Sequence, residues 1–171
     1  MVNDIIIRKS IKRDILFLEE LYKKSFPDEE LLPLVKELLS DERNVLSLSA
    51  MINDVVVGHI AFTKCYANPE NHNLSLLGPL AVVPDYQGKG VGSILIKDGF
   101  SLLRDNNIFK VLVLGDPSFY KKFGFEVEVK IKPPYMIPKE WESAWQSYEL
   151  TDVTKSVEGK LEVPKAWQRQ E

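Results

Sequence analysis

The chain has 171 residues, of which 44% are hydrophobic, and this is enough apolar material for one domain with its own core. A chain of this length buries about two-thirds of its unfolded surface, so it needs no disulfide or structural metal. Its formal net charge is −3 at pH 7, whereas a nucleic-acid-binding protein usually has an excess of basic residues.

The N-terminal part predicts one strand and two helices. Residues 5–8 are mostly β-branched, which is typical of a short strand. Apolar residues then recur at steps of three and four, which predicts a helix from about Arg13 to Phe26. Pro27 ends this helix, and Asp28 is the expected N-cap of a second one. The apolar stripe of the second helix is formed by Leu31, Leu34, Val35, Leu38 and Leu39.

A β-hairpin is expected next. Alternating apolar residues at 46–52 predict a strand with one buried face, and the return strand runs over about 55–66. The two residues between them, Asn53 and Asp54, are turn formers, although glycine is the usual second residue. A polar loop at 67–73 follows.

The chain is organised around residues 74–103. An almost unbroken apolar run at 74–83 predicts a strand buried on both faces. A loop with glycines at every second position, Gly88, Gly90 and Gly92, then opens a helix. Such a loop leaves backbone N–H groups unpaired at the positive end of the helix, which suits a phosphate or pyrophosphate, and Lys89 adds positive charge. Taken alone, the loop could also be an ordinary flexible turn.

The spacing of this loop separates it from two other phosphate-binding motifs. It fits neither the Walker A loop nor the dinucleotide fingerprint. It fits Gln-x-x-Gly-x-Gly, with Gln87, Gly90 and Gly92. A second block at 114–125 carries Gly-Asp-Pro followed by Tyr-x-x-Phe-Gly-Phe, and it predicts a short helix at 118–123 that Gly124 terminates.

Together the two blocks resemble the GCN5-related N-acetyltransferase (GNAT) family, in particular a bacterial and archaeal branch of predicted N-acetyltransferases. The resemblance covers about Ile5 to Val129. It implies an α/β (α+β) fold, with a mixed, mostly antiparallel twisted sheet, splayed central strands and helices on both faces. Residues 1–129 would form the acetyltransferase core, and residues 130–171 an extension packed on the same domain.

Gly78–Pro79 interrupts the strand at 74–83, because proline cannot donate to a sheet ladder. It predicts a bulge that stops pairing with the next strand, at 110–114, and leaves the amides of Leu80 and Val82 for a ligand. In the resembled family the pantetheine arm lies in such a gap. The alternative is that Gly78–Pro79 merely ends the strand early.

The resemblance implies acetyl-CoA as co-substrate and a set of residues that bind it. They belong to the strand end, the glycine loop, the first helical turn and the segment after Gly115. They are Leu80, Ala81, Val82, Gln87, Gly88, Lys89, Gly90, Val91, Gly92, Ser93, Pro117 and Tyr120.

The implied reaction is direct attack of a primary amine on the acetyl thioester. A thiol with a pKa near ~8.5 departs more readily when it is protonated, and a tyrosine near ~10 can supply that proton. Tyr120 stands where many family members keep such a tyrosine, so the resemblance implies that it is the general acid. Its alternative role is packing on the pantetheine or hydrogen bonding to the sulfur.

Asp116 ends a central strand and is the candidate base, although a helix cap is the simpler account.

Other candidates for the base have simpler explanations. His59 lies in a strand, where a satisfied core histidine is the commoner case, and His72 lies in a polar loop. Glu29 and Glu30 could face an amine, but they also suit a solvated helix start. A water-relayed base, or none, also fits. Cysteine, histidine and carboxylate residues show no metal-ligand spacing, so no metal is predicted.

The segment at 130–171 carries all three tryptophans. Trp141 and Trp145 lie four apart, which suits one face of a short helix, and 148–150 and 161–163 could be short strands, as could 125–129 before them. Core packing is the first interpretation of the tryptophans. Lining a substrate cleft or a homodimer contact stays open.

Three functions are therefore compared: an N-acetyltransferase, a non-catalytic CoA-binding or regulatory module of the same fold, and an enzyme with another acyl donor or a hydroxyl acceptor. The acceptor is a small molecule or a peptide that the sequence does not identify.

The single cysteine, Cys65, favours a reducing compartment and is expected to be inert. Without a signal sequence or an apolar run of ~18–20 residues, we expect a soluble cytoplasmic protein with no membrane or nucleic-acid partner.

Overall fold

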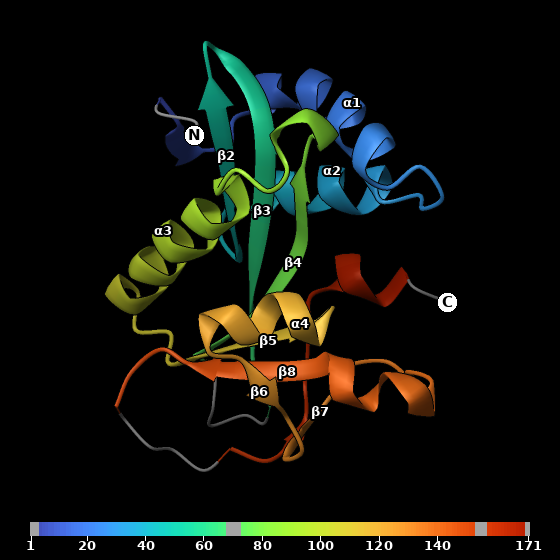
Figure 1. Cartoon of the computed structure of the whole chain (residues 1–171). Coiled ribbons are helices and arrows are strands. Elements are labelled where there is room, and N and C mark those ends of the chain that lie inside the picture. The colour runs from blue at the N-terminus through green and yellow to red at the C-terminus, as the bar shows by residue number, and fades with distance from the viewer. Residues whose placement is uncertain (1–3, 68–72, 153–156, 170–171) are drawn as a thin grey trace. The chain divides into compact units, whose positions relative to one another are not determined.

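Figure 1 shows the computed structural model of the chain, which describes residues 4–67, 73–152 and 157–169. The chain forms two compact units. The first contains Met1–Phe62 and Pro79–Ser101, and the second contains Thr63–Gly78 and Leu102–Glu171. None of the helices in the described ranges is both long enough and apolar enough to span a membrane.

The elements have the following bounds. The strands are β1 (Ile6–Lys9), β2 (Val45–Ile52), β3 (Val55–Cys65), β4 (Leu74–Val82), β5 (Lys110–Leu114), β6 (Glu126–Val127), β7 (Ile131–Lys132), β8 (Trp145–Glu149) and β9 (Gly159–Lys160). The α-helices are α1 (Ile15–Ser25), α2 (Leu32–Ser40), α3 (Val91–Asp105) and α4 (Pro117–Tyr120). The 3₁₀ helices are η1 (Lys12–Asp14), η2 (Pro84–Tyr86), η3 (Lys121–Phe123), η4 (Lys139–Ala144) and η5 (Lys165–Arg169).

Seven strands form one sheet in the order β1-β2-β3-β4-β5-β8-β6, and β7 pairs with β9 separately. β4 and β5 are parallel, whereas β1 with β2, β5 with β8, and β6 with β8 are antiparallel. The predicted α+β fold with a mixed, mostly antiparallel sheet is confirmed.

In the first unit, α1 and α2 bury their apolar stripes in a shared core. The stripes meet β3 and β4 in one cluster formed by Leu18, Leu21, Tyr22, Val35, Val56 and Ala81. The predicted hairpin is present as β2 and β3. Its turn residues Asn53 and Asp54 have φ of 50° and 63°, the left-handed conformation that a two-residue hairpin turn requires and that Asn and Asp tolerate. The turn therefore forms without the usual glycine.

The predicted start of the second helix is wrong. Asp28 is not its N-cap, because α2 begins at Leu32 and Leu31 occupies the cap position without a side-chain hydrogen bond. Pro33 lies in the first turn, where the N–H that proline lacks would have no helical partner. The proline therefore fixes the helix start more strongly than the acidic residues before it.

In the second unit, β8 lies between β5 and β6 (Figure 1). It pairs with β5 along its whole length, from Trp145↔Leu114 to Glu149↔Lys110, and with β6 over two residues. The expected strands at 125–129 and 161–163 are shorter or displaced, to β6 and β9, and Glu162 forms an isolated bridge with Tyr66. Residues after 130 therefore contribute a strand to the main sheet.

The prediction for Trp141 and Trp145 is wrong, because they do not share a helix face. η4 ends at Ala144, and a 3₁₀ helix has three residues per turn, so positions four apart diverge. Trp145 begins β8, is 2% exposed and donates Nε1–H to the Ile131 carbonyl at 2.7 Å, whereas Trp141 is 51% exposed. Trp167 is also buried and donates to Thr63 Oγ1 at 3.0 Å. Core packing is confirmed for two of the three tryptophans.

Candidate active site

The glycine loop leaves the end of β4 through a tight turn in the first unit. The Val83 N–H donates to the Val57 carbonyl on β3 at 2.9 Å. η2 then reverses the chain, with Tyr86 N–H bonded to the Val83 carbonyl and Gln87 N–H to the Pro84 carbonyl, at 2.9 and 3.3 Å. The end of the strand is therefore fixed before the glycines begin.

Gly88 and Gly90 are required by their backbone conformation. Their φ values are 75° and 89°, which L-residues with a side chain rarely adopt. A Cβ added at either position would meet no protein atom within 4 Å. The space beside the loop is therefore open, as an approaching ligand would need.

Helix α3 starts directly after this loop. Its first internal hydrogen bond runs from Ile94 N–H to the Gly90 carbonyl at 3.1 Å, so the amides of Val91, Gly92 and Ser93 precede the helical ladder. These amides lie at the positive end of a 15-residue helix, which is a suitable place for an anion. Lys89 is exposed, and its Nζ lies 5.5 Å from the centre of the Tyr86 ring.

The side chain of Gln87 closes the loop on its own strand. Its Nε2 donates to the Val82 carbonyl at 2.8 Å, and the Ser25 hydroxyl donates to the same oxygen at 3.0 Å. The sequence placed Gln87 among the cofactor-binding residues without indicating this contact. The amide of its side chain holds the loop shape.

In the second unit, pairing between β4 and β5 ends where the sequence predicted an interruption. The parallel register runs from Leu74↔Lys110 to Leu77↔Val113. The next residue, Gly78, has φ of 146°, and a Cβ on it would approach the Trp167 ring to 3.3 Å. A glycine at this position thus permits both the backbone conformation and the close approach of the tryptophan.

Asp116 caps the short helix α4. Its Oδ1 accepts hydrogen bonds from the backbone N–H and the hydroxyl of Ser118, at 2.9 and 2.8 Å. Pro117 occupies the first helical position, which suits a residue without an N–H. The side chain is exposed and the cap uses only one carboxylate oxygen. The simpler account of Asp116 as a cap is thus correct, and its role as a base stays a prediction.

Tyr120 is held by aromatic and backbone packing. Its ring makes edge contacts with Phe119 and Phe125, with centroids 5.0 and 5.4 Å apart. It also lies so close to Gly115 that a Cβ there would collide with ring atom Cε2. Burial raises the pKa of the Tyr120 hydroxyl, so the group keeps its proton well into the alkaline range. Within the described part of the chain, no hydrogen bond engages this hydroxyl.

Two of the other candidate bases are surface residues. Glu29 and Glu30 are exposed in the turn before α2, and His72 lies outside the described residues. Cys65 is buried, as a small core hydrophobe would be, and burial raises the pKa of its thiol, which disfavours the reactive thiolate form. Across residues 4–67, 73–152 and 157–169, side chains form no group of three that could hold a metal ion.

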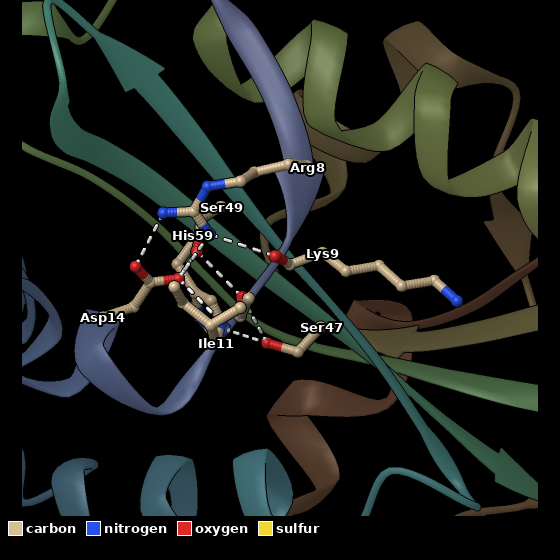
Figure 2. Close-up of polar contacts among 8 residues, drawn as sticks. Arg8, Lys9, Ile11, Asp14, Ser47, Ser49 and His59 are labelled. Carbon is tan, nitrogen blue, oxygen red and sulfur yellow. Dashed lines mark hydrogen bonds and ion pairs between the residues drawn. The ribbon is translucent and has the colours of Figure 1, made fainter.

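His59 belongs to a buried polar network that sequence reasoning missed (Figure 2). The network begins at an ion pair between Arg8 and Asp14, with two hydrogen bonds of 2.7 and 2.8 Å. Asp14 also accepts from the Ile11 N–H and the Ser49 hydroxyl. Burial opposes the charge of Asp14, but these hydrogen bonds and the guanidinium outweigh it and lower the pKa of the carboxyl.

From Asp14 the network continues to Tyr22. Ser10 bridges the hydroxyls of Ser49 and Ser47 at 2.8 Å each. His59 then bonds Ser47 through Nε2 at 2.7 Å and Tyr22 through Nδ1 at 2.6 Å. Because a carboxylate only accepts, each hydroxyl must donate toward Asp14. This assigns the proton of neutral His59 to Nε2, and Tyr22 donates to Nδ1.

The only sequence signal for this network is a set of small polar residues inside buried strands. Ser49 and His59 are 0% and 1% exposed, and His59 is a satisfied core group, as its simpler explanation held. Burial lowers the pKa of His59 to about 4, so the ring is neutral at physiological pH.

The sequence of the chain is similar to a family profile and to individual proteins that are all described as acetyltransferases. Residues 15–125 match the profile of the acetyltransferase (GNAT) family. The chain is 38% identical over 147 residues to the uncharacterized N-acetyltransferase YjhQ of Escherichia coli K12, covering 82% of this chain and 81% of that protein. It is 30% identical over 151 residues to the uncharacterized N-acetyltransferase YhbS of the same strain, covering 86% and 88%.

Two solved structures have the same fold. The crystal structure of E. coli YhbS in complex with CoA superimposes with a TM-score of 0.87 at 29% identity, covering 98% of this chain and 93% of that one. A GNAT family acetyltransferase from Brucella melitensis, in complex with acetyl-CoA, gives a TM-score of 0.78 and covers 96% and 98%. At 24% identity, this second likeness concerns the fold alone.

Proposed function

Because the chain belongs to the acetyltransferase (GNAT) family and is an acetyl-CoA-dependent N-acetyltransferase, we propose that it acetylates a primary amine by direct attack, with Tyr120 as general acid. The observation that carries the proposal is the open glycine loop at the N-terminus of α3, where Gly88 and Gly90 leave room for an anion. Binding of CoA by YhbS supports this use of the loop.

The cofactor would be held mainly by backbone groups. The pyrophosphate would accept hydrogen bonds from the amides of Val91, Gly92 and Ser93, with Lys89 as counter-charge. The pantetheine arm would lie along Leu80–Val82 and pair with strand amides. Backbone recognition explains why the loop needs glycine conformations more than particular side chains. The remaining residues proposed to contact the cofactor are Ala81, Gln87, Gly88, Gly90, Pro117 and Tyr120.

The proposed chemistry forms a C–N bond and breaks a C–S bond. A neutral amine attacks the thioester carbonyl, and the tetrahedral intermediate collapses with departure of the CoA thiolate. Tyr120 gives its proton to that sulfur and regains one from solvent. Burial raises the pKa of the hydroxyl, so Tyr120 would carry the proton at neutral pH but would be a weaker acid than an exposed tyrosine. The role therefore depends on the position of Tyr120 in the second motif and not on its acidity.

The proton lost by the amine has two proposed destinations. One is the Asp116 carboxylate, of which the cap uses only Oδ1. The other is water. Asp116→Asn separates them, because asparagine also caps helices but cannot accept the proton as a carboxylate does. A rate loss of ~10² or more would indicate a base, and an unchanged rate would indicate water.

The proposal is tested with purified protein, acetyl-CoA and a panel of primary amines of small molecules and peptides. Release of free thiol reports transfer, and calorimetry reports CoA binding. We expect acetyl-CoA binding without an amine and thiol release only with a suitable amine. Binding without thiol release across the whole panel would instead favour the non-catalytic CoA-binding module.

A further inference from the structure

The carbonyl oxygen of Val82, the last residue of β4, receives two side-chain hydrogen bonds from different elements. Gln87 Nε2 donates at 2.8 Å and Ser25 Oγ at 3.0 Å. A carbonyl oxygen has two lone pairs, so both are occupied. The other end of the same peptide group, the Val83 N–H, donates to the Val57 carbonyl at 2.9 Å. This peptide plane is therefore held from both sides.

The direction of these bonds places Ser25 and Gln87 on a particular edge of β4. A trans peptide points its C=O and N–H in opposite directions. Since the Val83 N–H points to β3, the Val82 carbonyl points away from β3. In an extended strand the N–H and C=O of one residue share a side, so the Val82 amide also faces away from β3. Leu80, two residues earlier, faces the same way.

Comparison with a second serine shows that a serine at the end of a helix does not always bond to a neighbouring strand, as Ser25 does. Both α1 and α2 end on a serine, Ser25 and Ser40. The Ser40 hydroxyl donates to the backbone carbonyl of Glu37 in its own helix at 2.7 Å, which is a common hydrogen-bond pattern for serine in helices. The Ser25 hydroxyl leaves its helix and bonds the strand instead.

The packing of α1 supports this contact. Tyr22, one turn before Ser25, packs in the same apolar cluster as Ala81, the neighbour of Val82. The hydrogen bond between Tyr22 and His59 fixes this part of α1 to β3. Ser25 is half-buried, so its bond to Val82 is partly shielded from competing water.

We propose that Ser25 is a positioning residue for acetyl-CoA, an inference that rests on the proposed function. With Gln87 it saturates the Val82 carbonyl and orients the adjacent Val82 amide. A ligand at Val82 can then only accept a hydrogen bond from the N–H, because the carbonyl has no lone pair left for a ligand donor. An amide carbonyl of the pantetheine arm is such an acceptor, whereas the nucleotide part of CoA binds at the loop.

The test compares two variants of equal shape, Ser25→Thr, which keeps the hydroxyl, and Ser25→Val, which replaces it by a methyl group. Calorimetry measures the affinity of each for CoA and for adenosine 3′,5′-diphosphate, which has no pantetheine. We expect Ser25→Val to bind CoA about five- to tenfold more weakly than Ser25→Thr, as the loss of one hydrogen bond implies. Affinity for adenosine 3′,5′-diphosphate should be equal in the two.

Ser40→Ala is the matched control, since it removes the helix-terminal hydroxyl that stays within its own helix, and its CoA affinity should equal that of the parent. Thermal unfolding confirms that every variant is folded, and Ser25→Ala replaces Ser25→Val if valine is too large.

Equal CoA affinity in the Thr and Val variants would overturn the inference. So would an equal loss for both ligands, because the effect would then not concern the pantetheine. A parent protein that does not bind CoA would instead overturn the proposed cofactor role itself.

Discussion

His59 is a residue whose burial has a measurable consequence. Its ring is neutral in the fold because burial lowers its pKa to about 4, against about 6.5 in an unfolded chain. Between these values the unfolded state binds more protons, so stability falls as the pH falls. The difference corresponds to about 3 kcal/mol, which is present above pH ~6.5 and lost by pH ~4.

We therefore expect the parent protein to lose about 3 kcal/mol of unfolding free energy between pH 6.5 and pH 4. His59→Gln keeps a donor and an acceptor but cannot titrate, so its stability should change less over this interval. Urea unfolding of both proteins at the two pH values is the measurement. Asp14 does not confuse the result, because its lowered pKa places its own loss of stability below pH ~4. Equal pH dependence in parent and variant would contradict the assignment.

Gly115 is a second residue with a specific expectation. A Cβ there would collide with the Tyr120 ring, which cannot move easily among Phe119 and Phe125. Gly115→Ala should displace the Tyr120 hydroxyl and slow acetyl transfer by about tenfold or more, with little change in CoA affinity. Steady-state kinetics with acetyl-CoA and calorimetry with CoA check this. Unchanged turnover would show that the exact position of the ring is not important.

At the scale of elements, the N-terminus of α3 is the proposed anion site. Gly92→Glu adds a negative charge and a bulky side chain next to the amides of Val91 and Ser93. We expect CoA affinity to fall at least ~10²-fold by calorimetry, because like charges in a site exclude one another. Ser101→Glu makes the same change of charge at an exposed position of the same helix and should have no such effect. Full affinity in Gly92→Glu would place the phosphates elsewhere.

The elements also show what could be predicted from the sequence. The hairpin, α3 and β5 follow from strong periodicity and turn residues, and the end of β4–β5 pairing follows from Gly78–Pro79. The start of α2 was missed because Pro33 overrides an acidic N-cap signal. The short β6, β7 and β9 are set by pairing with distant partners, which local sequence does not reveal.

The candidate site also contains some features that local sequence predicts and others that it does not. The glycine loop, Asp116 and Tyr120 lie in local motifs, so their backbone settings could be expected. The contacts of Ser25 with Val82 and of Tyr22 with His59 join residues far apart in the chain. No periodicity or motif indicates them, because they depend on tertiary packing.

At the scale of the whole molecule, the boundary between a core at 1–129 and an extension at 130–171 stays a prediction. β8 comes from the second segment and pairs with β5 along its whole length. Removal of 130–171 would expose the edge of β5 that pairs with β8 and leave the backbone groups on that edge unpaired, although β4 would still pair with the other edge. We expect the truncated chain to show no cooperative thermal unfolding by circular dichroism. A truncated chain that melts near the temperature of the full chain would show that the extension is an independent appendage.

The central claim is that Tyr120 protonates the departing thiolate. Tyr120→Phe keeps the ring that packs on Phe119 and Phe125 and removes only the hydroxyl, so CoA affinity should change little. Turnover should slow by ~10²-fold or more, because a proton donor acts in the transition state. Tyr135→Phe is the control, since it removes another hydroxyl whose pKa burial raises, and turnover should be unchanged.

The direct measurement is the pH profile of turnover for the parent and Tyr120→Phe, with an acceptor amine found in the panel. The parent should show an ascending limb from loss of a proton by the amine or its base. It should also show a descending limb above pH ~10, where Tyr120 ionises, shifted upward by burial of the hydroxyl. The variant should be slow and should lack the descending limb. A variant that turns over as fast as the parent and keeps that limb would contradict the account, because the thiolate would then leave without Tyr120.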